Sequence, residues 1–142
     1  MKRSITKSFT MVARISGLIA IGLGIVHLGA GSASVSAHTF FGVLLVGAVW
    51  ALAVQIRSSA IGLAFAAGAW GFILPALGMA QLNISPGPAQ WALRAVHVLV
   101  GITGIALAEI MAKRLLTTRA ASQSVQASED APSLREESPT PE

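Results

Sequence analysis

Four apolar segments, each about twenty residues long, limit how this chain can fold. They cover about residues 11–31, 39–56, 60–80 and 91–111. A helix needs about 20 apolar residues to cross a hydrocarbon core about 30 Å thick, and each segment is close to that length. Four strands cannot satisfy their backbone hydrogen bonds in lipid, whereas helices satisfy theirs internally. The sequence therefore predicts an all-α protein with four transmembrane helices.

Composition and connection lengths define the architecture further. Of the 142 residues, 54% are hydrophobic and only 11% are charged, whereas soluble domains carry about 25% charged residues. The connections, residues 32–38, 57–59 and 82–90, are short, which favours an up-down-up-down bundle. The chain contains no cysteine, so zinc or iron–sulfur sites built on thiolates are excluded. Residues 1–116 form the predicted transmembrane domain.

The remaining residues, 117–142, differ in composition. Ser, Pro, Glu and Ala dominate this segment, which also holds five of the six acidic residues. Such a segment has little to bury, so we expect a disordered cytoplasmic tail. The net charge of +4 thus combines a basic membrane domain with an acidic tail. The basic flank indicates contact with anionic lipid of the bilayer, and no motif indicates nucleic-acid binding.

Basic residues predict the orientation of the bundle. Arg94 alone lies near one side of the membrane, and eight others lie on the opposite side: Lys2, Arg3, Lys7, Arg14, Arg57, Lys113, Arg114 and Arg119. Basic residues accumulate on the cytoplasmic side of membrane proteins. We therefore expect a multi-pass protein of the bacterial inner membrane with both termini in the cytoplasm.

The N-terminus also permits another interpretation. Basic residues, an apolar run and the letters SVSA before His38 resemble a cleaved secretory signal. Cleavage after Ala37 would make His38 an N-terminal residue, which is a known type of copper ligand. The apolar run is longer than a usual signal core, and the charge distribution is satisfied without cleavage. The uncleaved four-span chain is therefore the preferred interpretation.

The three histidines are predicted to share one level of the membrane. His38 lies at the outer end of the second span, and His27 lies roughly 6 Å below the outer end of the first. His97 lies roughly 9 Å below the outer end of the fourth span. Ionisable residues inside spans are costly and tend to mark function. Histidines that only bond between helices are the simpler alternative.

Glycines accompany these histidines at helical spacing and suggest a flat ligand. Gly24 precedes His27 on the first span, and Gly101 follows His97 on the fourth. Haem b combines axial histidines with apolar walls, and small residues allow close approach of its ring. Arg94, one turn from His97, could contact a haem propionate or simply extend to the interface. Copper held by the same nitrogens is a weaker candidate, because no methionine-rich or carboxylate partner accompanies them on the outer side.

The four spans and the in-membrane histidines resemble small four-helix membrane cytochromes of the b561 type. The resemblance covers about residues 11–111 and implies haem b and electron transfer. Three histidines are too few for the two haems of that family. A weaker likeness, carried by RISGLIAIGLGIVHL at residues 14–28, is to DoxX-like four-span membrane proteins.

Two classes of function follow. The first is a one-haem cytochrome b-like electron-transfer subunit, with His97 and His27 as axial ligands and His38 at a propionate or a partner surface. The roles of His27 and His38 can also be exchanged. Its electron partner would be a quinone or a larger membrane complex at the outer face. The second class is a non-catalytic accessory or scaffold subunit of such a complex. Near the inner end of the fourth span, Glu109 is expected to pair with Lys113, one turn away.

The orientation can be tested by cysteine labelling, because the chain has no native cysteine. A reagent that stays outside the cell should label a cysteine placed at Ser34 and miss one placed at Ser58. Labelling of both after membrane permeabilisation is the control for accessibility. The opposite pattern in intact cells would overturn the predicted orientation.

Overall fold

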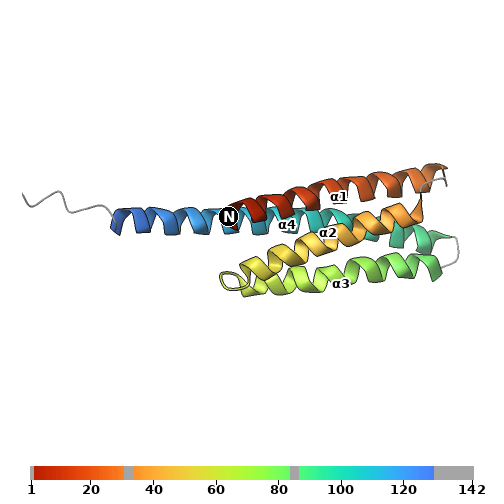
Figure 1. Cartoon of the computed structure of the whole chain (residues 1–142). Helices are drawn as coiled ribbons and strands as arrows, with labels where there is room; N and C mark the ends of the chain where they lie inside the picture. The colour runs from red at the N-terminus through yellow and green to blue at the C-terminus, as the bar shows by residue number, and fades with distance from the viewer. Residues whose placement is uncertain (1, 31–33, 84–86, 130–142) are drawn as a thin grey trace, which may run out of the picture.

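The protein is a bundle of four antiparallel helices (Figure 1). The computed structural model describes residues 2–30, 34–83 and 87–129, and its elements are α1 (Lys2–Ala30), α2 (Val35–Ile56), α3 (Ile61–Asn83) and α4 (Pro88–Glu129). All four helices are long and apolar enough to cross a membrane. The prediction of an all-α, four-span, up-down-up-down bundle is confirmed. Parts of the predicted 32–38 and 82–90 connections lie outside the described residues.

Local hydrogen bonds and a proline explain where the helices begin and how α2 is connected to α3. The Ser34 hydroxyl caps α2 by accepting a hydrogen bond from the Ala37 amide at 3.3 Å. Between α2 and α3, the amide of Ser59 donates to the carbonyl of Ile56 at 2.9 Å, which closes a tight turn. Helix α4 begins at Pro88. Proline suits the first turn of a helix, because an N–H group there would have no acceptor within the helix and its absence costs nothing. Short turns therefore keep consecutive helices adjacent.

Helices α2 and α4 form the centre of the bundle. They contact each other, and both contact α1 and α3. Within the described ranges, α1 and α3 make no comparable contact with each other. The two central helices can therefore line an internal site from both sides, while α1 and α3 enclose it.

Close packing is concentrated in one half of the bundle, which we call the base. The base holds the N-terminus and the turn between α2 and α3 (Figure 1). Its largest fully buried side chains are Leu52, Ile56, Met111, Val49 and Thr6. The exterior of the bundle is also apolar, and Leu18, Phe65, Phe72 and Leu99 are each more than 60% exposed. Because water would not stabilise such a surface, the chain is an integral membrane protein in contact with the lipid bilayer.

A polar network joins three helices within the base. Thr6 of α1 donates to Gln55 of α2 at 2.9 Å, and Arg119 of α4 donates to Thr6 at 2.7 Å. Thr6 is fully buried, so these bonds satisfy a hydroxyl that has left water. Arg119, at a position predicted to lie in the tail, is instead part of the folded bundle.

Helix α4 continues beyond the predicted start of the tail at Thr117. It remains helical to Glu129, and residues 120–128 are all exposed. Alanines and glutamines favour a helix there, even though the segment buries no apolar surface. The rest of the predicted tail, residues 130–142, lies outside the described residues.

Two truncations should distinguish the exposed part of α4 from the part that packs. A chain ending at Ala121 should insert and melt in detergent like the full chain. A chain ending at Thr117 should lose about 1–3 kcal/mol of stability, because a charged hydrogen-bond donor to Thr6 is removed. The full-length Arg119→Met variant should reproduce most of that loss. Equal melting temperatures for all four proteins would show that the network contributes nothing to stability.

Candidate functional site

A cavity of about 620 Å³ lies between the four helices in the half of the bundle opposite the base. Its walls come from residues 17–27 of α1, 34–46 of α2 and its N-cap, 74–81 of α3 and 90–101 of α4. The volume falls within the range of about 300–1,000 Å³ typical of ligand and cofactor sites. The bundle is therefore packed at one end and hollow at the other.

Every residue that the sequence marked for a cofactor lines this cavity. The six are His27, His38, His97, Arg94, Gly24 and Gly101. They come from α1, α2 and α4, and α3 completes the enclosure with Pro75, Gly78 and Gln81. The structure thus brings the predicted set together in one place. That they bind a cofactor stays a prediction.

His38 is held in a defined orientation by α1. Its Nδ1 lies 2.9 Å from the carbonyl oxygen of Ala20. Because a carbonyl only accepts hydrogen bonds, Nδ1 must carry the proton, and neutral His38 keeps its lone pair on Nε2. The ring also packs on Gly24, where an added Cβ would lie 3.5 Å from its Cε1. Metal-bound histidines typically show this arrangement, with the second ring nitrogen donating to a carbonyl.

His97 lines the same cavity from α4, and its ring makes fewer hydrogen bonds than that of His38. Its ring packs on Gly78 of α3, where an added Cβ would lie 3.5 Å from Cε1. Its Nδ1 is buried and has no hydrogen-bond partner within the described part of the chain. A buried, unpaired polar atom costs about 1–3 kcal/mol. The buried Nδ1 of His97 is therefore a candidate contact for a group bound in the cavity.

The rings of His38 and His97 lie close together in the lining of the cavity. Their centroids are 6.0 Å apart, and their planes are inclined by 42°. Metal–imidazole bonds of about 2.0–2.1 Å place two rings on opposite sides of one metal with centroids roughly 6 Å apart. The separation of the His38 and His97 centroids is compatible with two ligands of a single metal centre.

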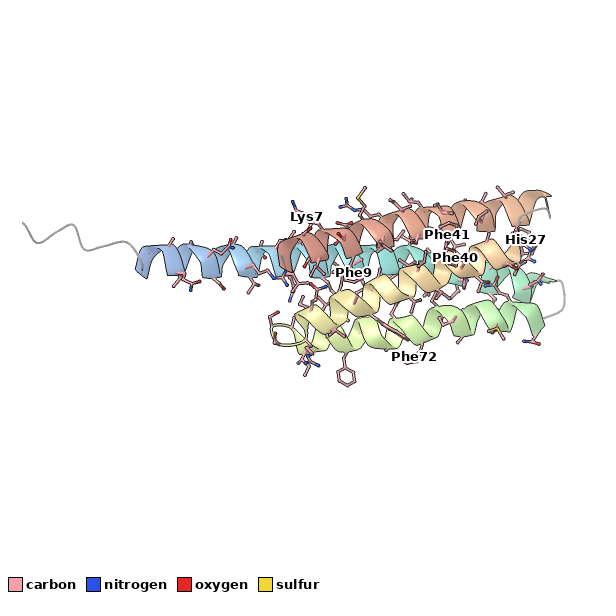
Figure 2. All side chains as sticks on the ribbon, viewed as in Figure 1. Lys7, Phe9, His27, Phe40, Phe41 and Phe72 are labelled. Carbon is pink, nitrogen blue, oxygen red and sulfur yellow. The ribbon has the colours of Figure 1, made fainter. Side chains whose placement is uncertain are left out.

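Within the described residues, no ring contact joins His27 to this pair. His27 lines the cavity but is exposed, at the end of the bundle opposite the N-terminus (Figure 2). The structure places His38 beside His97, which favours the exchanged roles over the pairing of His27 with His97. Counting residues along a helix gives the level of a side chain, but not the direction in which it points.

Polar side chains also reach the cavity toward the end of the bundle opposite the base. Arg94 lines it and lies over the Trp91 ring, with Cζ 5.5 Å from the ring centroid, a cation–π contact. Gln81 and Gln90 line the cavity as well. Gln90 was not recognised as a site residue from the sequence. Its spacing of four and seven residues from Arg94 and His97, the period of one helical face, could have revealed it.

Trp70 lies on the base side of the cavity, one helical turn from Leu74, which lines it. It is buried in the core, and its indole N–H donates to the carbonyl of Val100 at 2.8 Å. The ring occupies the space beside Gly104, where an added Cβ would lie 2.0 Å from Cζ2. The glycine is therefore required for this close approach of α3 and α4.

Comparison with known proteins gave no match to a family model, a curated protein or a solved structure. The resemblance to b561-type cytochromes and to DoxX-like proteins therefore stays an expectation. Within the described residues, no group of three or more histidine, cysteine or acidic side chains could hold a metal ion. The cavity and its histidine pair carry the functional argument.

Alanine substitution at two glycines of α4 should distinguish the effect of a steric clash with Trp70 on stability from the effect of helix propensity alone. Gly104→Ala should destabilise the bundle by about 1–3 kcal/mol, because the rigid indole has to move. Gly101→Ala is the matched control, because a Cβ there would meet nothing within 4 Å. Thermal unfolding in detergent compares the two. Equal stability of the two variants would contradict the placement of Trp70.

Proposed function

We propose that this protein is a cytochrome b-like electron-transfer subunit that binds one haem b, with His38 and His97 as its axial ligands. One observation carries the proposal: two imidazole rings with centroids 6.0 Å apart in a cavity of about 620 Å³ within a membrane bundle. A bound haem b would supply a one-electron redox centre.

The residues present fit this group. His38 has its lone pair on Nε2, and the buried Nδ1 of His97 lacks a partner. Neutral imidazoles are the usual axial ligands of haem b, and the surrounding walls are mostly aliphatic. Gly24, Gly78 and Gly101 present surfaces without side chains, and the Arg94 guanidinium suits a propionate. The same nitrogens suit copper less well, because the cavity lining contains no carboxylate or thiolate.

One haem at one side of the membrane limits the direction of electron transfer. All three histidines line the same cavity, so none is left to ligate a second haem in the base. Electrons would therefore enter and leave at the outer face, through a quinone or a partner subunit. The clustering of basic residues such as Lys7, Arg57 and Arg119 at the base supports cytoplasmic termini in a bacterial inner membrane.

Visible spectroscopy of the purified protein tests the proposal. The wild type, produced with ample haem, should show a low-spin reduced-minus-oxidised spectrum with one haem per chain. His38→Ala and His97→Ala should lose it, because each removes an axial ligand. His27→Ala is the matched control and should retain the spectrum. Circular dichroism and melting temperature should confirm that each variant is inserted and folded.

Two outcomes would change the interpretation. Loss of the spectrum in His27→Ala with retention in His38→Ala would restore the pairing first expected from the sequence. If the wild type takes up no haem, the cytochrome proposal fails. The chain would then be better regarded as an accessory subunit of a larger membrane complex.

A further inference from the structure

An ion pair joins the exposed faces of α1 and α4, away from the histidine cavity. Arg14 donates from both Nε and Nη2 to the carboxylate of Glu109, with the Nη2–Oε2 distance 2.8 Å. Glu109 thus pairs with α1 and not, as the sequence suggested, with Lys113 on its own helix. The partner is 95 positions away in the chain, where local helical spacing gives no information. The pair shows which faces of the two helices lie side by side.

Two lysines lie on these same faces, nearer the end of the base. Lys7 precedes Arg14 by seven residues on α1, and Lys113 follows Glu109 by four residues on α4. Both intervals return a side chain to one face of a helix. Both lysines are exposed, and Lys7 lies on the side of α1 away from α2 and α3 (Figure 2). Their ammonium groups therefore lie on the surface that α1 and α4 share.

The register of the two helices places these ammonium groups within reach of one anion. Arg119 bonds Thr6, and the ion pair lies eight residues farther along α1 and ten residues back along α4. This register separates Lys7 and Lys113 by about 6–8 Å along the bundle axis, on helices whose axes lie about 8–10 Å apart. Lysine side chains are long and flexible, and each ammonium donates three hydrogen bonds. The two lysines are therefore placed to bind a single anion between them.

The lysines also form a positive site separate from the other basic residues of the base. The ion pair carries no net charge of its own, and within the described ranges neither lysine pairs with a carboxylate. Two further exposed cations lie elsewhere. Arg57 follows the end of α2, at the turn to α3, and Arg114 is rotated by about 100° around α4 from Lys113. One side of the base thus carries two lysines that face the same space.

Exposed apolar side chains continue the two faces toward the middle of the bundle. Met11 and Leu18 share the face of Lys7, and Ile102 precedes Lys113 by eleven residues, close to three helical turns. These eleven residues of α4 rise about 16 Å, which is about half of a hydrocarbon core about 30 Å thick. A positive site followed by an apolar strip one leaflet long matches a phosphate with an acyl chain better than it matches a free anion.

We propose that this surface of α1 and α4 binds one anionic phospholipid, with its phosphate between Lys7 and Lys113 and an acyl chain along the apolar side chains beyond them. Ammonium groups bind phosphate as point charges, and basic residues beside a membrane attract anionic lipid. The sequence indicates only that the basic flank as a whole faces lipid. The structure adds a site on one side of the bundle, and this site is independent of haem.

Native mass spectrometry of the full-length protein in detergent tests the site, with phosphatidylglycerol and zwitterionic phosphatidylcholine of equal chain length as probes. The wild type should bind its first phosphatidylglycerol more tightly than phosphatidylcholine. Lys7→Gln and Lys113→Gln should each raise the dissociation constant for phosphatidylglycerol about fivefold, because each removes one cation from the phosphate. Melting temperatures should show that both variants remain folded, since both side chains are exposed.

Arg57→Gln and Arg114→Gln are the matched controls, because each removes one positive charge from the same end of the bundle but not from the site. Both should bind phosphatidylglycerol within about twofold of the wild type, since salt screens exposed charges at longer distance. Excess glycerol phosphate, which lacks acyl chains, should not displace the lipid. Equal affinity of the wild type for the two lipids, equal losses in all four variants, or displacement by glycerol phosphate would each overturn the proposal.

Discussion

The buried indole of Trp70 lies between the packed base of this bundle and its cavity. It fills the space beside Gly104 and donates to the carbonyl of Val100, so that α3 and α4 are fixed to each other near mid-bundle. On the base side of this contact, the four helices pack closely around Leu52 and Met111. On its other side the helices enclose the cavity. The cavity therefore begins where the close packing around Trp70 and Gly104 ends.

This division has a physical basis in the membrane. Lipid chains are as apolar as the helix surfaces, so packing and interhelical polar contacts must hold the helices together. The base supplies both, through its small residues and the bonds among Thr6, Gln55 and Arg119. The opposite half instead lines the cavity with polar side chains, among them His38, His97 and Arg94. Each central helix contributes one histidine, and each histidine packs on a glycine of a flanking helix.

Much of the fold could be predicted from the sequence because the membrane limits the alternatives. Four apolar segments with short connections permit little besides an antiparallel bundle. The common level of the histidines also followed from counting residues along helices. The end of α4 was less predictable, because its polar composition indicated disorder while its alanines and glutamines sustain a helix to Glu129. Arg119 anchors the start of that extension through a bond to α1.

Contacts between helices could not be predicted in the same way. The contact of His38 with His97, and not His27, depends on how the helices are rotated and tilted. The Arg14–Glu109 pair joins residues far apart in the chain, so local spacing suggested Lys113 instead. Nothing in the sequence distinguishes Trp70 from the other aromatic residues of the spans. Only the structure shows that its ring packs beside Gly104.

Pulsed electron paramagnetic resonance of the oxidised protein tests the central claim most directly. Protein produced with ¹⁵N-labelled histidine and ample haem should give a low-spin ferric signal. Two imidazole nitrogens should couple strongly to the iron, and both should persist in the His27→Ala variant. A single coupled imidazole, a high-spin signal, or loss of one coupling in His27→Ala would contradict a haem held between His38 and His97.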